Sequence, residues 1–212
     1  LYEAEKKDSK VIFYFYSLNY SIIMSDKKRY NPPGMLNANW ENYYVWNKLH
    51  EKQLKKYCKY KFNVIATFPT TYTTGNKKFV KPAQKFVTVF DVTPIRKTFY
   101  KTLFLPSQQY NQDDMIAFLT DILDICKKHD FKLILKNKRL TGASHKKYLY
   151  FLEKFIKEKN VLLFDQDISS VSLIQQSQFI ISYPMTSPNS LANFFNIKNC
   201  YYQPITEYFL DE

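Results

Sequence analysis

Short apolar runs alternate with amphipathic segments along the second half of the chain. Residues 86–92 are apolar and rich in β-branched side chains, broken only by Thr88 and Asp91, which predicts a strand buried on both faces of a parallel sheet. Asn111 is a good N-cap for a helix whose apolar residues recur at helical spacing. The same pattern predicts strands at 131–135, 161–164, 179–182 and 200–202, and helices at 145–159, 169–176 and 187–195.

This alternation predicts an α/β fold with a doubly wound, Rossmann-like parallel sheet. Ligands bind such sheets beyond the carboxyl ends of the strands, near the point where the strand order reverses. The residues that directly follow the predicted strands are therefore the first candidates for function.

The first 80 residues follow a less regular pattern. Apolar runs at 11–16, 42–46 and 62–68 predict strands, and a Lys- and Glu-rich stretch at 47–58 predicts a helix. Residues 70–85 are rich in Thr, Lys and Pro, which is typical of a linker. We expect a domain boundary near residue 80.

Basic residues follow two of the predicted strands. Arg96 lies shortly after the strand at 86–92, and Lys136, Lys138 and Arg139 follow the strand at 131–135. A solvated turn is the plain alternative for such a charge run. Because the charges directly follow an apolar strand, we expect Lys136 or Arg139 to contact phosphate, with Lys138 the weaker candidate.

The segment after the strand at 179–182 has the features of a phosphate site. Ser187 followed by Pro188 predicts a helix start, with Ser as the N-cap and Pro at the first helical position. The free amides of that first turn, with the hydroxyls of Thr186, Ser187 and Ser190, would bind an anion. The alternative is that these residues only cap a helix.

Composition narrows the function classes. The formal net charge is +12, but only three of the 31 basic residues are arginines, so the charge favours an anionic partner without naming one. Three widely spaced cysteines favour a reducing, cytosolic setting over a disulfide framework. Three scattered glycines cannot supply a dinucleotide fingerprint or a Walker loop.

The sequence offers little support for a metal site or for a catalytic triad built on a histidine. Asp165-Gln-Asp167 matches an Asp-x-Asp metal motif only weakly, and capping of the next helix is the better interpretation. The histidines, His50, His129 and His145, lie in or beside lysine-rich segments, where an exposed surface position is expected. We therefore expect no metal site, and only a minor chance of ligand contact at His145.

Several of these segments together resemble one family. Phe179-Ile-Ile-Ser-Tyr-Pro-Met-Thr-Ser-Pro188, followed by Leu191-Ala192, is similar to the signature of bacterial polysaccharide-biosynthesis proteins named for a Pro-Phe-Thr-Ser motif. Met185 stands where the name-giving Phe is expected and keeps an apolar side chain there. The segments Phe90-Asp-Val-Thr-Pro94, Lys136-Asn-Lys-Arg139 and Val45-Trp46-Asn47 are also similar to that family.

The resemblance implies a glycosyltransferase of the GT-B type, which has two facing Rossmann-like domains. Residues 1–80 would be the end of the N-terminal domain plus a linker, and residues 81–212 the C-terminal domain that binds the nucleotide-sugar donor. Because two such domains need about 300 residues or more, the acceptor site and general base would lie largely outside this chain. We do not expect the chain to be active alone.

The resemblance also implies a mechanism and partners. Thr186 and Ser187 would hold the donor phosphate, with Ser190 nearby, while Arg96, Lys136 and Arg139 would stabilise the departing charge without a metal or cofactor. The acceptor would be a glycan or a lipid-linked glycan. The expected location is the cytoplasm, at the inner face of the membrane through the basic surface.

Two alternatives stay open. One is a non-catalytic protein that binds single-stranded nucleic acid through lysines and stacking tyrosines, for which Tyr14, Tyr16, Tyr20, Tyr43 and Tyr44 are available. Because most aromatic residues fall in runs that must supply the core, and no RNA-binding signature is present, nucleic acid is not the expected partner. The other alternative is a Rossmann-like scaffold that has lost its chemistry.

Overall fold

The computed structural model describes residues 7, 9–15, 23–25, 28–30, 40–67, 79–96, 98, 111–137, 142–164, 168–184, 186–204 and 209–210. The chain separates into two compact units. The first comprises Leu1–Tyr72, Met185–Ser190 and Glu207–Glu212, and the second comprises Thr73–Pro184 and Leu191–Thr206. The expected division at residue 80 into a domain end and a donor-binding domain stays a prediction.

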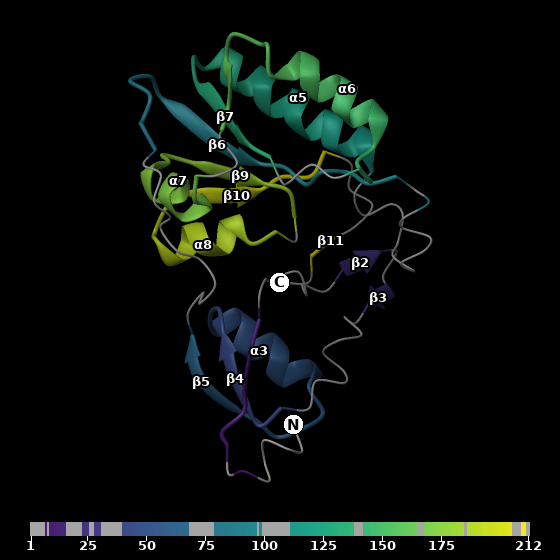
Figure 1. Cartoon of the computed structure of the whole chain (residues 1–212), viewed down its shortest axis with the longest axis vertical. Coiled ribbons are helices and arrows are strands. Elements are labelled where there is room, and N and C mark those ends of the chain that lie inside the picture. Colours follow the sequence, from purple (N-terminus) through teal and green to yellow (C-terminus); the bar gives the residue numbers. More distant parts are fainter. Residues whose placement is uncertain are drawn as a thin grey trace. The chain divides into compact units, whose positions relative to one another are not determined.

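The second unit is built around a five-stranded sheet in which every neighbouring pair is parallel (Figure 1). A helix follows each of its first four strands. The strands, in the spatial order β10-β9-β6-β7-β8, are β10 (Asn199–Tyr201), β9 (Ile180–Ser182), β6 (Phe86–Phe90), β7 (Lys132–Lys136) and β8 (Val161–Leu163). The helices are α5 (Gln112–Lys128), α6 (Lys146–Phe155), α7 (Ser170–Gln176) and α8 (Pro188–Phe194), of which the part up to Ser190 falls in the first unit.

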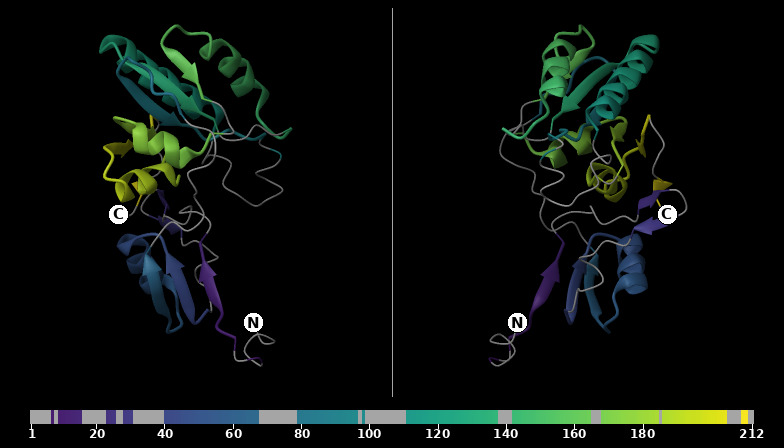
Figure 2. Two further views of the ribbon diagram at one scale, coloured as in Figure 1. Left: turned by 60° about the vertical axis from the view of Figure 1, so that its left-hand side comes forward. Right: turned by 90° about the vertical axis from the view of Figure 1, so that its right-hand side faces the viewer.

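The two faces of this sheet are covered by different helices. Figure 2 shows α5 and α6 on one face and α7 and α8 on the other. On the α5 and α6 face, Val89 of β6 packs with Phe118 and Leu119 of α5, all of them fully buried. On the other face, Thr88 hydrogen-bonds Ser177, which directly follows α7, at 2.6 Å between the two hydroxyl oxygens. The predicted α/β, Rossmann-like class is confirmed.

Local sequence explains where α5 begins. Asn111 is its N-cap, and the Asn111 side chain accepts a hydrogen bond from the backbone N–H of Asp113 at 3.0 Å. Asp113 and Asp114 lie in the first turn and Lys127 and Lys128 in the last, the charge order that a helix dipole favours. The helix expected at 145–159 is shorter, since α6 ends at Phe155.

The first unit contains two small sheets. Strands β1 (Ile12–Tyr14), β4 (Asn42–Val45) and β5 (Asn63–Thr67) form a parallel sheet in the order β1-β4-β5, and α3 (Lys48–Tyr57) connects β4 to β5. Strands β11 (Phe209–Leu210), β2 (Ile23–Ser25) and β3 (Lys28–Tyr30) form an antiparallel sheet. The sequence pattern did not predict this second sheet, because its strands have two or three residues and one partner comes from the end of the chain.

His50 corrects the expectation of an exposed surface histidine. Its side chain is 1% exposed, and its ring lies 4.4 Å from that of Phe15, centroid to centroid. Asn47, the N-cap of α3, accepts from the His50 backbone N–H at 2.8 Å, while Nδ1 of His50 accepts from the Trp46 backbone N–H at 3.2 Å. Burial lowers the pKa of His50 to about 3. The neutral ring therefore fixes the start of α3.

Tyrosine hydroxyls fasten helices to the sheet at three places in the described part of the second unit. Tyr148 of α6 donates to Asp91, which directly follows β6. Tyr183, which directly follows β9, donates to Asp114 of α5, and Tyr202 donates to Asp121 of the same helix at 2.6 Å. Because each tyrosine or its partner follows a strand, these bonds set the positions of α5 and α6 at the carboxyl edge of the sheet.

The buried His50 predicts a loss of stability in mild acid. In the unfolded chain the pKa of His50 returns to about 6.5. Between that pH and about pH 3 the unfolded state binds a proton that the folded state does not bind, so acid favours unfolding. The free energy of unfolding should fall by up to about 1.4 kcal/mol per pH unit from this residue. Urea titrations of the wild type and His50→Gln between pH 7.5 and 4.5 measure it.

Carboxylates contribute equally to the pH dependence of stability in the wild type and in His50→Gln. The difference between the two slopes of unfolding free energy against pH therefore isolates His50. Equal slopes would show that this ring is protonated in the folded chain.

The Tyr148 hydroxyl predicts a second stability effect. Tyr148→Phe removes a donor from a carboxylate that is only 5% exposed, and should lower the free energy of unfolding by about 1–3 kcal/mol. Tyr150→Phe on the same helix is the matched control, because Tyr150 is 60% exposed and its change should stay within about 0.5 kcal/mol. Denaturant melts that cannot separate the two variants would contradict the prediction.

Candidate functional site

The order of the five-stranded sheet reverses between β6 and β9. From β6 the chain adds β7 and β8 on one side, and then returns to add β9 and β10 on the other. Phe90, the last residue of β6, pairs with Ser182, the last residue of β9. Asp91 and Tyr183 therefore leave the sheet at the same edge, where doubly wound sheets bind their ligands.

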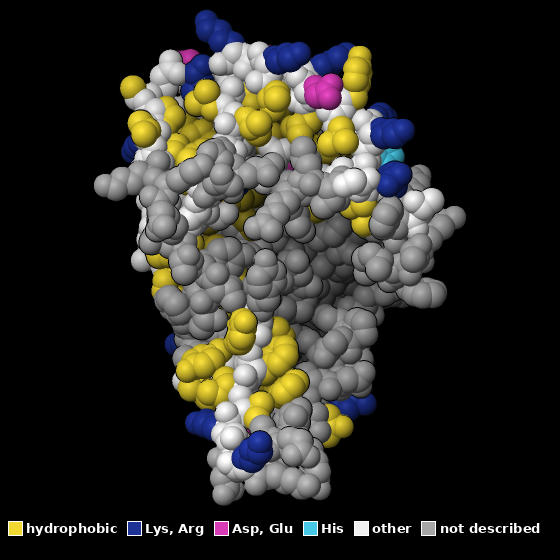
Figure 3. All heavy atoms as spheres, in the orientation of Figure 1, with side chains coloured by type: hydrophobic (Ala, Val, Ile, Leu, Met, Phe, Trp, Pro, Cys, Tyr) yellow, Lys and Arg dark blue, Asp and Glu magenta, His cyan; other side chains and the backbone are white. Residues whose placement is uncertain are grey.

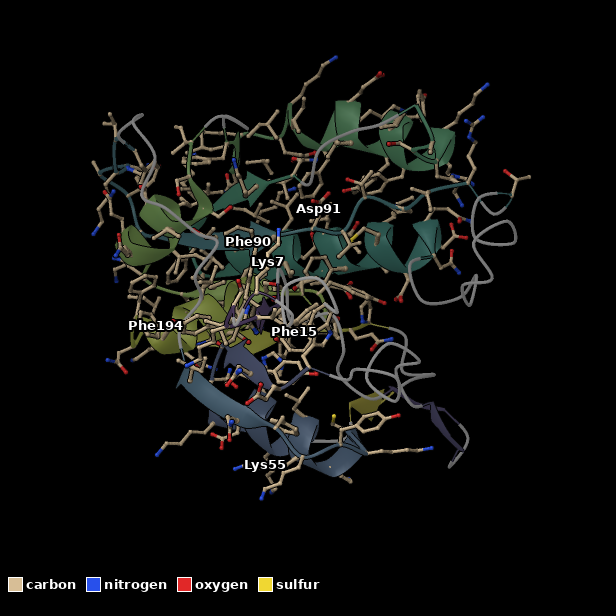
Figure 4. The ribbon with its side chains drawn as sticks, turned by 60° about the horizontal axis from the view of Figure 1, so that its bottom comes forward. Lys7, Phe15, Lys55, Phe90, Asp91 and Phe194 are labelled. Atoms are coloured by element: carbon tan, nitrogen blue, oxygen red, sulfur yellow. The ribbon has the colours of Figure 1, made fainter. Side chains whose placement is uncertain are left out.

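A buried carboxylate lies at this reversal. Asp91 accepts a hydrogen bond from the Tyr148 hydroxyl and a longer one, 3.4 Å, from Nδ2 of Asn137, both at its Oδ2. Burial, and then the nearby Asp91 charge, raise the pKa of Tyr148 well above its usual value of 10. The hydroxyl therefore stays a protonated donor. Figure 4 shows Asp91 on the side of α6, and Phe90 on the side of α7 and α8.

Lys136, the last residue of β7, is buried at the same edge. It is 7% exposed, its Nζ donates to the carbonyl of Ile168 at 2.9 Å, and Nζ lies 5.4 Å from the centre of the Phe164 ring. These contacts tie the end of β7 to the residues that precede α7. Contact between Lys136 and a phosphate stays a prediction.

Arg96 connects two loops beyond the strands. Its Nη2 donates to the carbonyl of Gly142 at 2.8 Å, and its backbone N–H donates to Ala143 at 2.9 Å. The backbone N–H of His145 donates in turn to Pro94 at 2.8 Å. The chain that leaves β6 is thus paired with the chain that enters α6. The Arg96 side chain is exposed, and its contact with phosphate also stays a prediction.

The hydroxyl residues of the predicted phosphate site belong to the other unit. Thr186, Ser187 and Ser190 fall in Met185–Ser190, which is part of the first unit, whereas Arg96 and Lys136 belong to the second. Ser187 is buried, and Thr186 and Ser190 are half-buried. Helix α8 begins at Pro188, as the sequence predicts, and has seven residues. Phosphate binding at this segment is untested.

Some predicted residues lie outside the described part of the chain. These are Arg139 and Lys138 of the basic cluster, and Asp165 and Asp167 of the weak metal motif. His129 is exposed, as expected. His145 is half-buried before α6, makes no side-chain capping bond, and among the described residues no hydrogen-bond partner reaches its Nδ1.

The described tyrosines among those proposed for nucleic-acid stacking differ in exposure. Tyr43 is fully buried and cannot stack on a base, while Tyr14 is 54% exposed. Tyr44 is half-buried, and Tyr16 and Tyr20 lie outside the described residues. Figure 3 shows lysine and arginine side chains distributed over both ends of the visible face, and apolar side chains over β4 and β5. Of the described tyrosines, Tyr43 is therefore excluded from stacking, and the nucleic-acid alternative is otherwise untested.

The sequence interpretation missed the three residues that form the polar cluster of this edge. Asp91 is a polar break in an apolar run, which by itself predicts no site. Asn137 lies between the lysines of the basic cluster, and the charges of those lysines, not the amide, predicted a phosphate site. Tyr148 lies on the buried side of α6 and is fully covered. Its hydroxyl partner is 57 positions away along the chain and left no local signal.

A family model matches the sequence of this chain. The model described as polysaccharide biosynthesis PFTS motif protein matches residues 1–210. A search of curated proteins finds none that matches the chain. In the described ranges no helix combines the length and the apolar character that a membrane span requires. The match covers nearly the whole sequence, so the chain belongs to the family of polysaccharide biosynthesis PFTS motif proteins.

Proposed function

We propose that this chain is the nucleotide-sugar-binding part of a glycosyltransferase that acts in surface polysaccharide synthesis. The family supplies the role in polysaccharide biosynthesis. The observation that supports the finer proposal is the reversal of strand order between β6 and β9, with the polar residues Asp91, Lys136 and Asn137 at the carboxyl edge beside it.

The proposed chemistry is transfer of the sugar to a hydroxyl of a glycan or a lipid-linked glycan. The acceptor hydroxyl passes its proton to a general base as its oxygen forms a bond to the anomeric carbon of the sugar, and the bond from that carbon to the phosphate oxygen breaks. The electron pair leaves with the nucleotide, so negative charge grows on its phosphate in the transition state. Fixed positive charges and hydroxyl donors at that position lower the barrier.

Residues of this chain would supply that stabilisation without a metal or cofactor. Arg96, Lys136 and Arg139 are the proposed positive charges, and Thr186, Ser187 and Ser190 the proposed hydroxyl donors. The Thr-Ser segment follows β9 directly in the chain, and β9 adjoins the reversal. Surface lysines would hold the protein at the cytoplasmic face of the membrane, where a lipid-linked acceptor is presented.

Nucleotide binding is the first test of this proposal. At about 100 times Kd, one of CMP, UDP and GDP should stabilise the fold by about 2.7 kcal/mol, and so raise Tm by several degrees. Ser187→Ala should weaken that nucleotide about tenfold, because a phosphate oxygen loses a hydroxyl donor. Thermal shift and calorimetry measure the two effects.

Thr120→Ala is the control, because its hydroxyl donates to Ile116 of its own helix on the exposed face of α5. Stabilisation by single-stranded oligonucleotides alone, lost steeply as salt rises, would replace this proposal with the nucleic-acid alternative.

Metal independence is tested on the same complex. Side-chain charges and hydroxyls are proposed to hold the phosphate. EDTA at about 5 mM, a large excess over trace metal, should therefore leave the nucleotide Kd unchanged within about twofold. A larger loss that Mg²⁺ or Mn²⁺ restores would show that the phosphate is held through a cation.

A further inference from the structure

The side chain of Asn137 has one half of its amide satisfied and the other half unused. Asn137 directly follows β7 and is 6% exposed. Its Nδ2 donates to Asp91, while its Oδ1 is buried and meets no hydrogen-bond donor in the part of the chain that the structure describes. A buried carbonyl oxygen without a donor destabilises the folded state, because it has lost its hydrogen bond to water. The Oδ1 atom of Asn137 is therefore an acceptor that a ligand with a hydrogen-bond donor could satisfy.

The neighbours of Asn137 determine which way the amide points. Oδ2 of Asp91 already accepts from the Tyr148 hydroxyl, and an ionised carboxylate can only accept. If the amide were turned over, its oxygen would face that carboxylate oxygen, and two acceptors would repel each other. The Tyr148–Asp91 pair therefore holds Nδ2 toward Asp91 and leaves Oδ1 as an acceptor of fixed orientation.

A fixed acceptor selects the chemistry of its ligand. Phosphate oxygens at neutral pH are acceptors, so they gain nothing at Oδ1. The complementary groups are hydroxyls and amines. Because Oδ1 is covered in the free protein, such a group reaches it only after a local displacement, which the missing hydrogen bond favours.

The position of Asn137 in the sheet decides among the hydroxyls of a nucleotide sugar. β7 adjoins β6 on the side away from β9, one strand from the reversal of strand order. Ligands of such sheets lie beyond the carboxyl ends of the strands near the reversal, and in the dinucleotide-binding members an acidic side chain hydrogen-bonds the ribose hydroxyls. We infer that Asn137 recognises the ribose of the donor, with Oδ1 accepting a hydrogen bond from a ribose hydroxyl. This inference rests on the proposed nucleotide binding.

A thermodynamic cycle between the side chain and the ligand hydroxyls tests the inference. The ligands are the one of CMP, UDP and GDP that binds best and its 2′,3′-dideoxy counterpart, and calorimetry measures Kd. The wild type should bind the dideoxy nucleotide about tenfold more weakly. Asn137→Leu should bind the parent nucleotide about tenfold more weakly and lose nothing further with the dideoxy ligand.

Asn160→Leu is the matched control. Asn160 precedes β8 at the amino edge of the sheet, and its Nδ2 also donates at 3.4 Å, to the carbonyl of Phe131. This variant should keep the full tenfold preference for the ribose hydroxyls. The comparison separates loss of an amide from loss of the recognition.

Each other outcome overturns the inference. If Asn137→Leu weakens both ligands and keeps the tenfold preference, Asn137 supports the fold or holds a water molecule, and the ribose is recognised elsewhere. If the wild type binds both ligands equally, no ribose hydroxyl is recognised, whether or not the variant folds. In both cases nucleotide binding stands. If no nucleotide binds, the proposed function and this inference fail together.

Discussion

The buried carboxylate of Asp91 is the constraint on which the carboxyl edge depends. A carboxylate that is 5% exposed is tolerated only when hydrogen bonds replace its water. Tyr148 from α6 and Asn137 from the end of β7 both donate to it. One side chain thus connects the residue after β6 to the residue after β7, holds Tyr148 of α6 and orients an amide. The cost of an unpaired charge keeps all three in place.

Tyrosine as the donor has an electrostatic consequence. A hydroxyl donor is neutral, so the hydrogen bond from Tyr148 adds no positive charge of its own beside the carboxylate. The Asp114 and Asp121 carboxylates of α5 are also bonded by tyrosines, Tyr183 and Tyr202. Three carboxylates of the second unit thus receive hydrogen bonds from neutral hydroxyls.

Much of the fold followed from periodicity, because its elements are defined by neighbours in sequence. The strands and helices of the second unit were predicted to within a few residues, since apolar runs and Asn111 mark them locally. The β2-β3-β11 sheet was missed because its pairing joins the two ends of the chain. His50 was misjudged because its helix is rich in Lys and Glu, and only the packing of Phe15 and the Trp46 amide makes a buried neutral ring favourable.

The candidate site was less predictable for a related reason. Composition directs attention to charge, and a lysine that follows an apolar strand looks like a phosphate ligand whether its ammonium is free or bonded. Lys136 donates to a backbone carbonyl, so any phosphate must compete with that bond. Asn137, its uncharged neighbour, has a buried acceptor that is not engaged by the described residues. At a buried edge, the residue with an unmet hydrogen bond tells more about the ligand than the residue with the charge.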